Sequence, residues 1–229
     1  MTPSSVQHDL EYLSKRGVKH LVHFTPAINV TSILQYGIRP RAYLEQHQID
    51  FKFTDEMRLD DKLDAISLSI SVANVKMLNY KRRESKEASF IMPEDAFCVL
   101  LVNPCILNEV DGYDLYPINA ASANAKSCTI EELFASENRT AIPEEWPTDI
   151  QAEILIKGVI NPKHIESIVF NPSDIFGNNP IHELANNLKQ QVKRLKLDCK
   201  IQADKENFAY TEDKLLEWYK NTKTYPIWD

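Results

Sequence analysis

The chain has 229 residues, of which 43% are hydrophobic and 26% are charged, and its formal net charge is −7. This length and composition predict a single domain over residues 1–229 and exclude a chain that is disordered throughout, while the net charge disfavours a nucleic-acid partner. No apolar run is long enough to span a membrane, and residues 1–17 lack the apolar centre of a signal peptide, so we expect a cytoplasmic protein that does not contact membranes.

The hydrophobic periodicity predicts helices at both ends of the chain and strands between them. Helices are expected over residues 4–16, 27–36, 180–195 and 212–221, with Gly17 and Gly37 ending the first two. Strands are expected over residues 18–25, 65–71, 96–103, 152–157 and 165–171. The βαβ alternation of a doubly wound sheet is missing, so the order predicts an α+β fold of about five strands, with helical elements in residues 1–17 and 180–229.

Positive charge is concentrated in two segments in spite of the negative total. The first comprises Lys76, Lys81, Arg82, Arg83 and Lys86, and the second comprises Lys189, Lys193, Arg194, Lys196 and Lys200. A local basic stripe can contact phosphates whatever the net charge is, although such a stripe can equally be a solvated surface. The first segment is the better candidate for a nucleic-acid contact.

Several common sites are excluded by the absence of their motifs. The chain has no G-x-G-x-x-G and no G-x-x-x-x-G-K-[ST] sequence, and its four cysteines are too far apart for a CxxC pair. His20 and His23 stand three apart in a predicted strand, so their side chains should point to opposite faces. We therefore expect no metal site.

The beginning of the predicted strand over residues 152–157 carries a carboxylate. Gln151 and Glu153 are two residues apart and should face the same side, while Ile154 and Ile156 face the core. Glu153 is either an exposed carboxylate at the rim of the strand or a catalytic group. A fixed carboxylate of this kind can stabilise positive charge that develops at a sugar carbon.

Three segments, in this order, resemble the DarT-type ADP-ribosyltransferases. Residues 22–37 (VHFTPAINVTSILQYG) are similar to the family's opening NAD-binding motif, with its His-x-Thr, Asn and Ile-Leu-x-x-Gly. Residues 68–78 (LSISVANVKML) resemble its middle segment, and residues 147–156 (PTDIQAEILI) resemble its catalytic-glutamate strand, followed by IESIVF as the next strand. Together the matches span about residues 18–171.

The resemblance implies an ADP-ribosyltransferase-like split β-sandwich with flanking helices, in which NAD is the co-substrate and no metal is needed. It implies that His23, Phe24 and Thr25 form the pocket for the nicotinamide riboside, and that Glu153 is the catalytic carboxylate. Asn29 and Ser32, on one face of the predicted helix, either contact the rest of NAD or are exposed polar residues. The implied activity is transfer of ADP-ribose to a base of single-stranded DNA by a toxin, with a macrodomain antitoxin as its partner.

The middle segment departs from the family pattern at one position. Family members that modify thymidine have an arginine where this chain has Asn74. A carboxamide can hydrogen-bond and orient a substrate, but it cannot take up a proton as a base. We therefore assign Asn74 to the catalytic site without the thymidine preference, and guanine becomes the expected base.

Residues 117–150 correspond to the loop that selects the acceptor in ADP-ribosyltransferases. Arg139 and Trp146 are its candidates for nucleic-acid contacts, in addition to Lys76, Lys81, Arg82 and Arg83. Trp146 could stack on an unpaired base or serve as a packing anchor. Two alternatives remain open: an ADP-ribosyltransferase that acts on RNA, and a catalytically silent nucleic-acid-binding domain of the same fold.

Overall fold

The structure, a computed structural model, describes residues 3–53, 62–84, 92–135, 142–175, 179–205 and 208. Its strands are β1 (Leu21–Pro26), β2 (Ala65–Ile70), β3 (Phe97–Val102), β4 (Gly112–Tyr116), β5 (Glu153–Lys157), β6 (Ile165–Phe170) and β7 (Lys200–Ala203). Its α-helices are α1 (Pro3–Lys15), α2 (Val30–Tyr36), α3 (Arg41–Gln46), α4 (Val75–Glu84) and α5 (Pro180–Leu195). Short 3₁₀ helices are η1 (Ala27–Asn29), η2 (Pro104–Asn108), η3 (Glu132–Phe134) and η5 (Pro162–His164).

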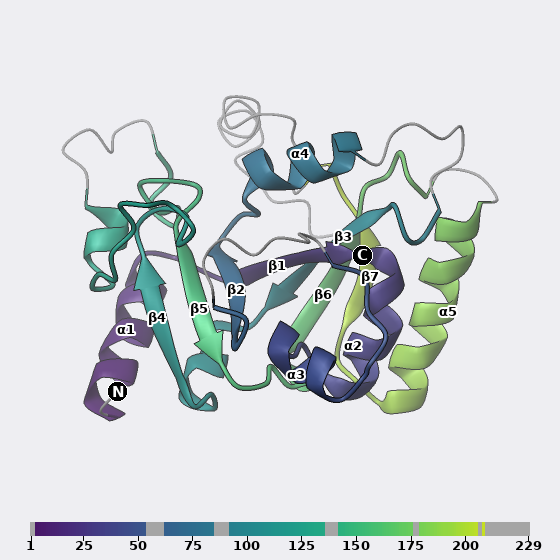
Figure 1. The fold of residues 1–229 in the computed structure, drawn as a ribbon, viewed down its shortest axis with the longest axis horizontal. Helices are drawn as coiled ribbons and strands as arrows, with labels where there is room; N and C mark the ends of the chain where they lie inside the picture. Colours follow the sequence, from purple (N-terminus) through teal and green to yellow (C-terminus); the bar gives the residue numbers. More distant parts are fainter. Residues whose placement is uncertain are drawn as a thin grey trace.

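The strands form one sheet in the order β4-β5-β2-β1-β3-β6-β7 (Figure 1). Neighbouring strands are antiparallel except β6 and β7, which are parallel and are connected by α5. Asn179 begins α5 by accepting the backbone N–H of His182 at 2.9 Å, with Pro180 in the first turn as expected. The predicted α+β class is confirmed.

The expectation of about five strands was wrong, because β4 and β7 were not predicted. Both are short, and β7 is an edge strand with only four residues. Helices α3 and α4 were missed as well, and β1 begins at Leu21 rather than at residue 18. The helix predicted over residues 212–221 lies outside the described residues.

Apolar side chains pack on both faces of the sheet, as strict alternation along the strands requires. On one face, Leu68 of β2 and Ile154 of β5 join the main core with residues of α1, α2 and α5. On the other face, Leu78 of α4 packs with Val22 and Val99. Helix α4 therefore covers the face opposite to the other long helices.

The sheet divides between β1 and β2. Strand β1 pairs with β3 through six residue pairs and β2 pairs with β5 through five. Between β1 and β2 there are only two pairs, Leu21 with Ile70 and Val22 with Ser69. Beyond Val22 the two strands separate, so two well-paired halves of the sheet enclose a gap.

Gly37 ends α2 and places the chain against the segment after β5. Its φ is +83° and its ψ is 172°, a combination that is essentially restricted to glycine. A Cβ at this position would lie 2.4 Å from the carbonyl oxygen of Ile160. The next residue, Ile38, forms an antiparallel bridge with Ile160, and the bridge fixes one end of the gap in the sheet.

Candidate active site

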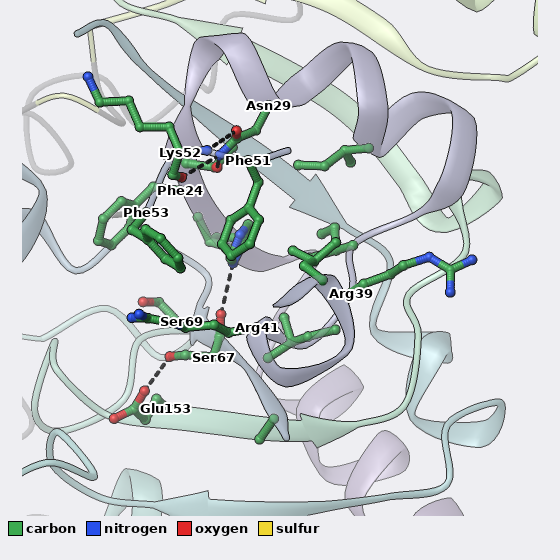
Figure 2. Close-up of a pocket in the computed structure, with 18 of the residues that line it drawn as sticks. Phe24, Asn29, Arg39, Arg41, Phe51, Lys52, Phe53, Ser67, Ser69 and Glu153 are labelled. Atoms are coloured by element: carbon green, nitrogen blue, oxygen red, sulfur yellow. Dashed lines mark hydrogen bonds between the residues drawn. The ribbon is translucent and has the colours of Figure 1, made fainter. Parts of the chain in front are cut away.

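A cavity of about 390 Å³ lies where β1 and β2 separate (Figure 2). Such a volume is typical of a small-molecule site. The expected site residues His23, Phe24, Thr25, Asn29, Ser32, Asn74 and Glu153 all line it, although they come from three distant parts of the chain. Tyr36, Arg39, Arg41, Phe51, Lys52 and Phe53 also line it and were not predicted.

His23 is the first residue of β1 beyond its pairing with β2. Its Nδ1 lies 3.0 Å from the backbone oxygen of Ser67, so the ring bridges the two halves of the sheet where the ladder is interrupted. A neutral imidazole that donates from Nδ1 keeps Nε2 as an acceptor, whereas an imidazolium donates from both nitrogens. The half-buried ring lines the cavity, and Nε2 is the nitrogen that a bound hydroxyl or amide would meet.

Glu153 is held by two donors at the other side of the gap. Its Oε2 accepts the hydroxyl of Ser67 and its Oε1 accepts the backbone N–H of Ala120. It is half-buried, and it is the one carboxylate among the described residues that line the cavity. A carboxylate has about four acceptor sites, so it can accept a hydrogen bond from a ligand in addition to these while its position stays fixed.

Asn74 is buried at the N-terminus of α4 and also lines the cavity. Its Oδ1 accepts the backbone N–H of Met77 at 3.1 Å, as an N-cap residue does. The cap fixes the orientation of the carboxamide, so Nδ2 is the group that remains to donate a hydrogen bond. Asn74 therefore has a structural role in addition to the catalytic role expected for it.

Residues 49–53, which we call the strap, form one wall of the cavity. Phe51 and Phe53 are in edge-to-face contact with ring centroids 4.3 Å apart, and both point into the cavity (Figure 2). The guanidinium of Arg41 lies 3.8 Å from the centroid of Phe53, a cation–π contact. The two aromatic residues and the basic Arg41 give the cavity a wall suited to a flat, polar ring system. Their F-x-F spacing was the one signal in the sequence that could have identified them.

Of the residues expected to bind nucleic acid, those that the structure describes do not form one surface. Lys76 is exposed and Lys81 is half-buried on α4, but Arg82 is 6% exposed and pairs with Asp174 at 3.6 Å. The expectation for Arg82 was wrong, since the amphipathic helix turns it toward the core. Arg139 and the side chain of Arg83 lie outside the described part of the structure.

Trp146 was also assigned wrongly to the nucleic-acid surface. Its side chain is 3% exposed and packs with Val72, Val75 and Ile150. This packing joins the segment before β5 to the beginning of α4, so Trp146 is a packing anchor and no base can stack on it in this conformation. Of the two roles that the sequence left open for Trp146, base stacking and packing, the structure supports packing.

Because Arg82 is buried, we expect its replacement to destabilise the protein, whereas replacement of a surface lysine should not. Replacing Arg82 with methionine leaves Asp174, which is 4% exposed, as a buried charge without its guanidinium. We expect the free energy of unfolding to fall by about 3 kcal/mol in urea titrations. Lys76→Ala, on the same helix, is the control and should change it by less than about 0.5 kcal/mol. Equal stabilities for the two variants would contradict the structural role of Arg82.

The two histidines near β1 have separate partners. His20 Nε2 lies 2.9 Å from Glu166, whereas His23 contacts Ser67. Burial lowers the pKa of His20, and the nearby Glu166 opposes this effect. Within the described residues, no group of three or more His, Cys, Asp or Glu side chains could hold a metal ion, and no helix is long and apolar enough to cross a membrane.

Comparison with known proteins identifies the fold. No family model and no curated protein matches the chain. The structure of Thermus sp. 2.9 DarT in complex with NAD+ has a TM-score of 0.54 at 10% identity, over 83% of this chain and 98% of that chain. The same DarT in complex with ADP-ribosylated ssDNA has a TM-score of 0.55 at 12% identity, over 84% of this chain and 97% of that chain.

A third solved structure is Thermosipho africanus DarTG in complex with ADP-ribose, with a TM-score of 0.52 at 18% identity. The match covers 83% of this chain but 51% of that one, so this chain spans about half the length of the DarTG chain. These similarities show that the chain has the fold of DarT. The resemblance found in three segments of the sequence is thus confirmed for the fold.

Proposed function

We propose that the chain is an NAD-dependent ADP-ribosyltransferase that modifies guanine in single-stranded DNA. The observation that carries this proposal is the meeting of His23 and Glu153 in one cavity, at the split of a sheet with the DarT fold. The DarT structures are complexes with NAD+ and with ADP-ribosylated ssDNA, and the cavity here lies between the strands that correspond to the predicted NAD-binding and catalytic segments.

The residues of the cavity fit NAD in their chemistry. The strap offers aromatic faces for a base or a nicotinamide ring, and the guanidinium of Arg41, which also pairs with Glu45 at 2.8 Å, lies against Phe53. His23 can bind a ribose hydroxyl or the carboxamide through Nε2, and Thr25 and Ser32 line the same cavity. Bound NAD would supply the ADP-ribosyl group and nicotinamide as the leaving group.

Glu153 would supply the main electrostatic contribution to the transfer. As the carbon–nitrogen bond to nicotinamide breaks, positive charge develops on the ribose, and a fixed carboxylate stabilises it. The bonds from Ser67 and Ala120 hold the carboxylate before any ligand binds, so little reorganisation is needed. If the exocyclic amine of guanine is the acceptor group, we assign the proton that it loses to Glu153 as well, because Asn74 cannot accept it.

The acceptor is proposed from two features. Single-stranded DNA is favoured over RNA because a DarT of this fold is solved with ADP-ribosylated ssDNA. Guanine is proposed because Asn74 stands where the family members that modify thymidine have an arginine, and its carboxamide can still donate from Nδ2 to a carbonyl oxygen of the base. Lys76 and Lys81 on α4, the helix that begins after Asn74, are the proposed contacts for the DNA backbone.

We further propose that the protein acts in the cytoplasm as a toxin with a macrodomain partner that removes ADP-ribose. The support is the similarity to DarTG, a longer chain solved with ADP-ribose. Co-expression with such a macrodomain should restore growth of cells that are inhibited by this chain. A growth defect that persists although the macrodomain is active on the modified DNA would contradict the pairing.

Mass spectrometry of short oligonucleotides tests the activity directly. Single-stranded DNA oligonucleotides that contain one guanine, or none, are incubated with the protein and NAD. We expect the mass of one ADP-ribose to be added only to oligonucleotides with guanine, and fragmentation should place it on that base. Matched RNA should react at least about tenfold more slowly, because the 2′-hydroxyl distinguishes the two polymers. Addition to thymidine instead would refute the guanine assignment, and no addition to any polymer would favour a silent binding domain.

A further inference from the structure

The side chain of Asn29 is used by the protein itself. Its Nδ2 donates to the backbone oxygen of Lys52 at 2.8 Å, and its Oδ1 accepts the backbone N–H of Lys52 at 2.8 Å (Figure 2). Nδ2 also donates to the hydroxyl of Thr25 at 3.0 Å. Both amide protons and one lone pair are thereby used, so the carboxamide pairs with one residue of the strap as a neighbouring strand would.

We propose that Asn29 is a positioning residue, which holds the strap at the correct distance from β1 instead of contacting NAD directly. Thr25 belongs to β1, two residues after His23, and Lys52 stands between Phe51 and Phe53. One carboxamide therefore connects the wall that carries the imidazole with the wall that carries the aromatic rings. The inference rests on the proposed function only for the identity of the ligand.

The ion pair that Lys52 forms is a weaker tether of the strap. The ammonium group of Lys52 lies 3.0 Å from Asp95, but the two side chains are 43% and 36% exposed. Ion pairs with this exposure contribute little to stability. The backbone contacts of Asn29 are thus the main fixed link between η1 and the strap, and the position of Phe51 depends on them.

Replacing Asn29 should lower the affinity for NAD, because it reduces the fraction of molecules in which the strap lies against the cavity. Without Asn29 the strap spends part of its time away from the cavity, and the apparent dissociation constant rises in proportion to the loss of the competent state. For Asn29→Ala we expect the KM for NAD to rise at least about tenfold, with kcat within about threefold of the wild-type value. Glu153 and its two donors are not touched by this change.

Amide hydrogen exchange of residue 52, measured by NMR, tests the link without any ligand. In the wild type this amide should be protected, because its N–H is bonded to Asn29. Asn29→Ala should raise its exchange rate about tenfold or more, while Ser32→Ala, at another polar residue of the cavity, and Lys52→Ala, which keeps the backbone, should leave it protected. Thr25→Val should weaken protection in part, since it removes one bond of Asn29 and keeps the shape of the side chain.

A raised KM in Asn29→Ala with unchanged protection of residue 52 would overturn the inference, because Asn29 would then contact NAD itself. Unchanged protection together with an unchanged KM would overturn it too. If Asn29→Ala does not fold, Asn29→Leu, which is close in shape and has no acceptor for the N–H of Lys52, should still show faster exchange than the wild type. Because exchange is measured without NAD, a failure of the wild type to bind NAD would refute the proposed function and leave this result interpretable.

Discussion

Replacing Glu153 with glutamine is expected to lower the rate of ADP-ribose transfer by about 10²–10³-fold, because the amide keeps the shape of the side chain and loses its charge. The fold should be preserved. The carbonyl oxygen of the glutamine can accept the N–H of Ala120, and its NH₂ group can donate to the hydroxyl of Ser67, which accepts as well as donates. The measurement is kcat for labelling of a guanine oligonucleotide, with the midpoint of thermal unfolding recorded for the same sample.

Lys157→Gln provides the matched control for Glu153→Gln. Lys157 is the last residue of the same strand, is exposed, and pairs with Asp114 at 3.2 Å outside the cavity. Its replacement should leave the rate within about twofold of the wild-type rate, since exposed pairs of this kind contribute little. A Glu153→Gln variant that folds and keeps more than about a tenth of the activity would rule out the proposed catalytic role.

The second large effect is expected on stability. Gly37→Ala should reduce the free energy of unfolding by about 3 kcal/mol or more, for two reasons. Its φ of +83° with ψ of 172° is unfavourable for any residue with a side chain. The added Cβ would also meet the backbone oxygen of Ile160 at 2.4 Å, and backbone cannot move aside as the end of a flexible side chain can.

Urea unfolding followed by circular dichroism measures this loss, and Gly112→Ala is its control. Gly112 begins β4, and a Cβ there would meet nothing within 4 Å. Its replacement should change the free energy of unfolding by less than about 0.5 kcal/mol. If Gly37→Ala and Gly112→Ala unfold at the same urea concentration, the argument from backbone conformation at residue 37 fails.

The fold could be predicted where the apolar pattern is regular. The strand around residues 65–71 alternates, the strand around residues 96–103 is a continuous apolar run, and the helix that begins at Pro180 has a helical period. All three were placed well. Helix α4 was missed because its sequence, VKMLNYKRRE, is mostly polar, and the acid that neutralises Arg82 is the distant Asp174. Strand β7 is stabilised by its pairing with β6 and has too few residues to show a period of its own.

The candidate site, like the fold, could be predicted from the sequence only in part. The segments that carry His23 and Glu153 were found through a family resemblance, but their meeting depends on where β1 leaves β2, which no local pattern specifies. The hydrogen-bonding roles of Asn29 and Asn74 could not be predicted from the sequence, for another reason. A carboxamide in a sequence looks the same whether it binds a ligand or bonds to the backbone of its own chain, and here both side chains do the latter.

Because β1 and β2 separate beyond Val22, each of them presents a strand edge in the middle of the sheet. Edges of this kind carry backbone groups that would ordinarily recruit a foreign strand and promote aggregation. Here the imidazole of His23 hydrogen-bonds to the carbonyl of Ser67, and Phe51 and Phe53 line the same opening. The groups that make the opening polar are consequently shielded from other protein chains, while a small molecule can still reach them.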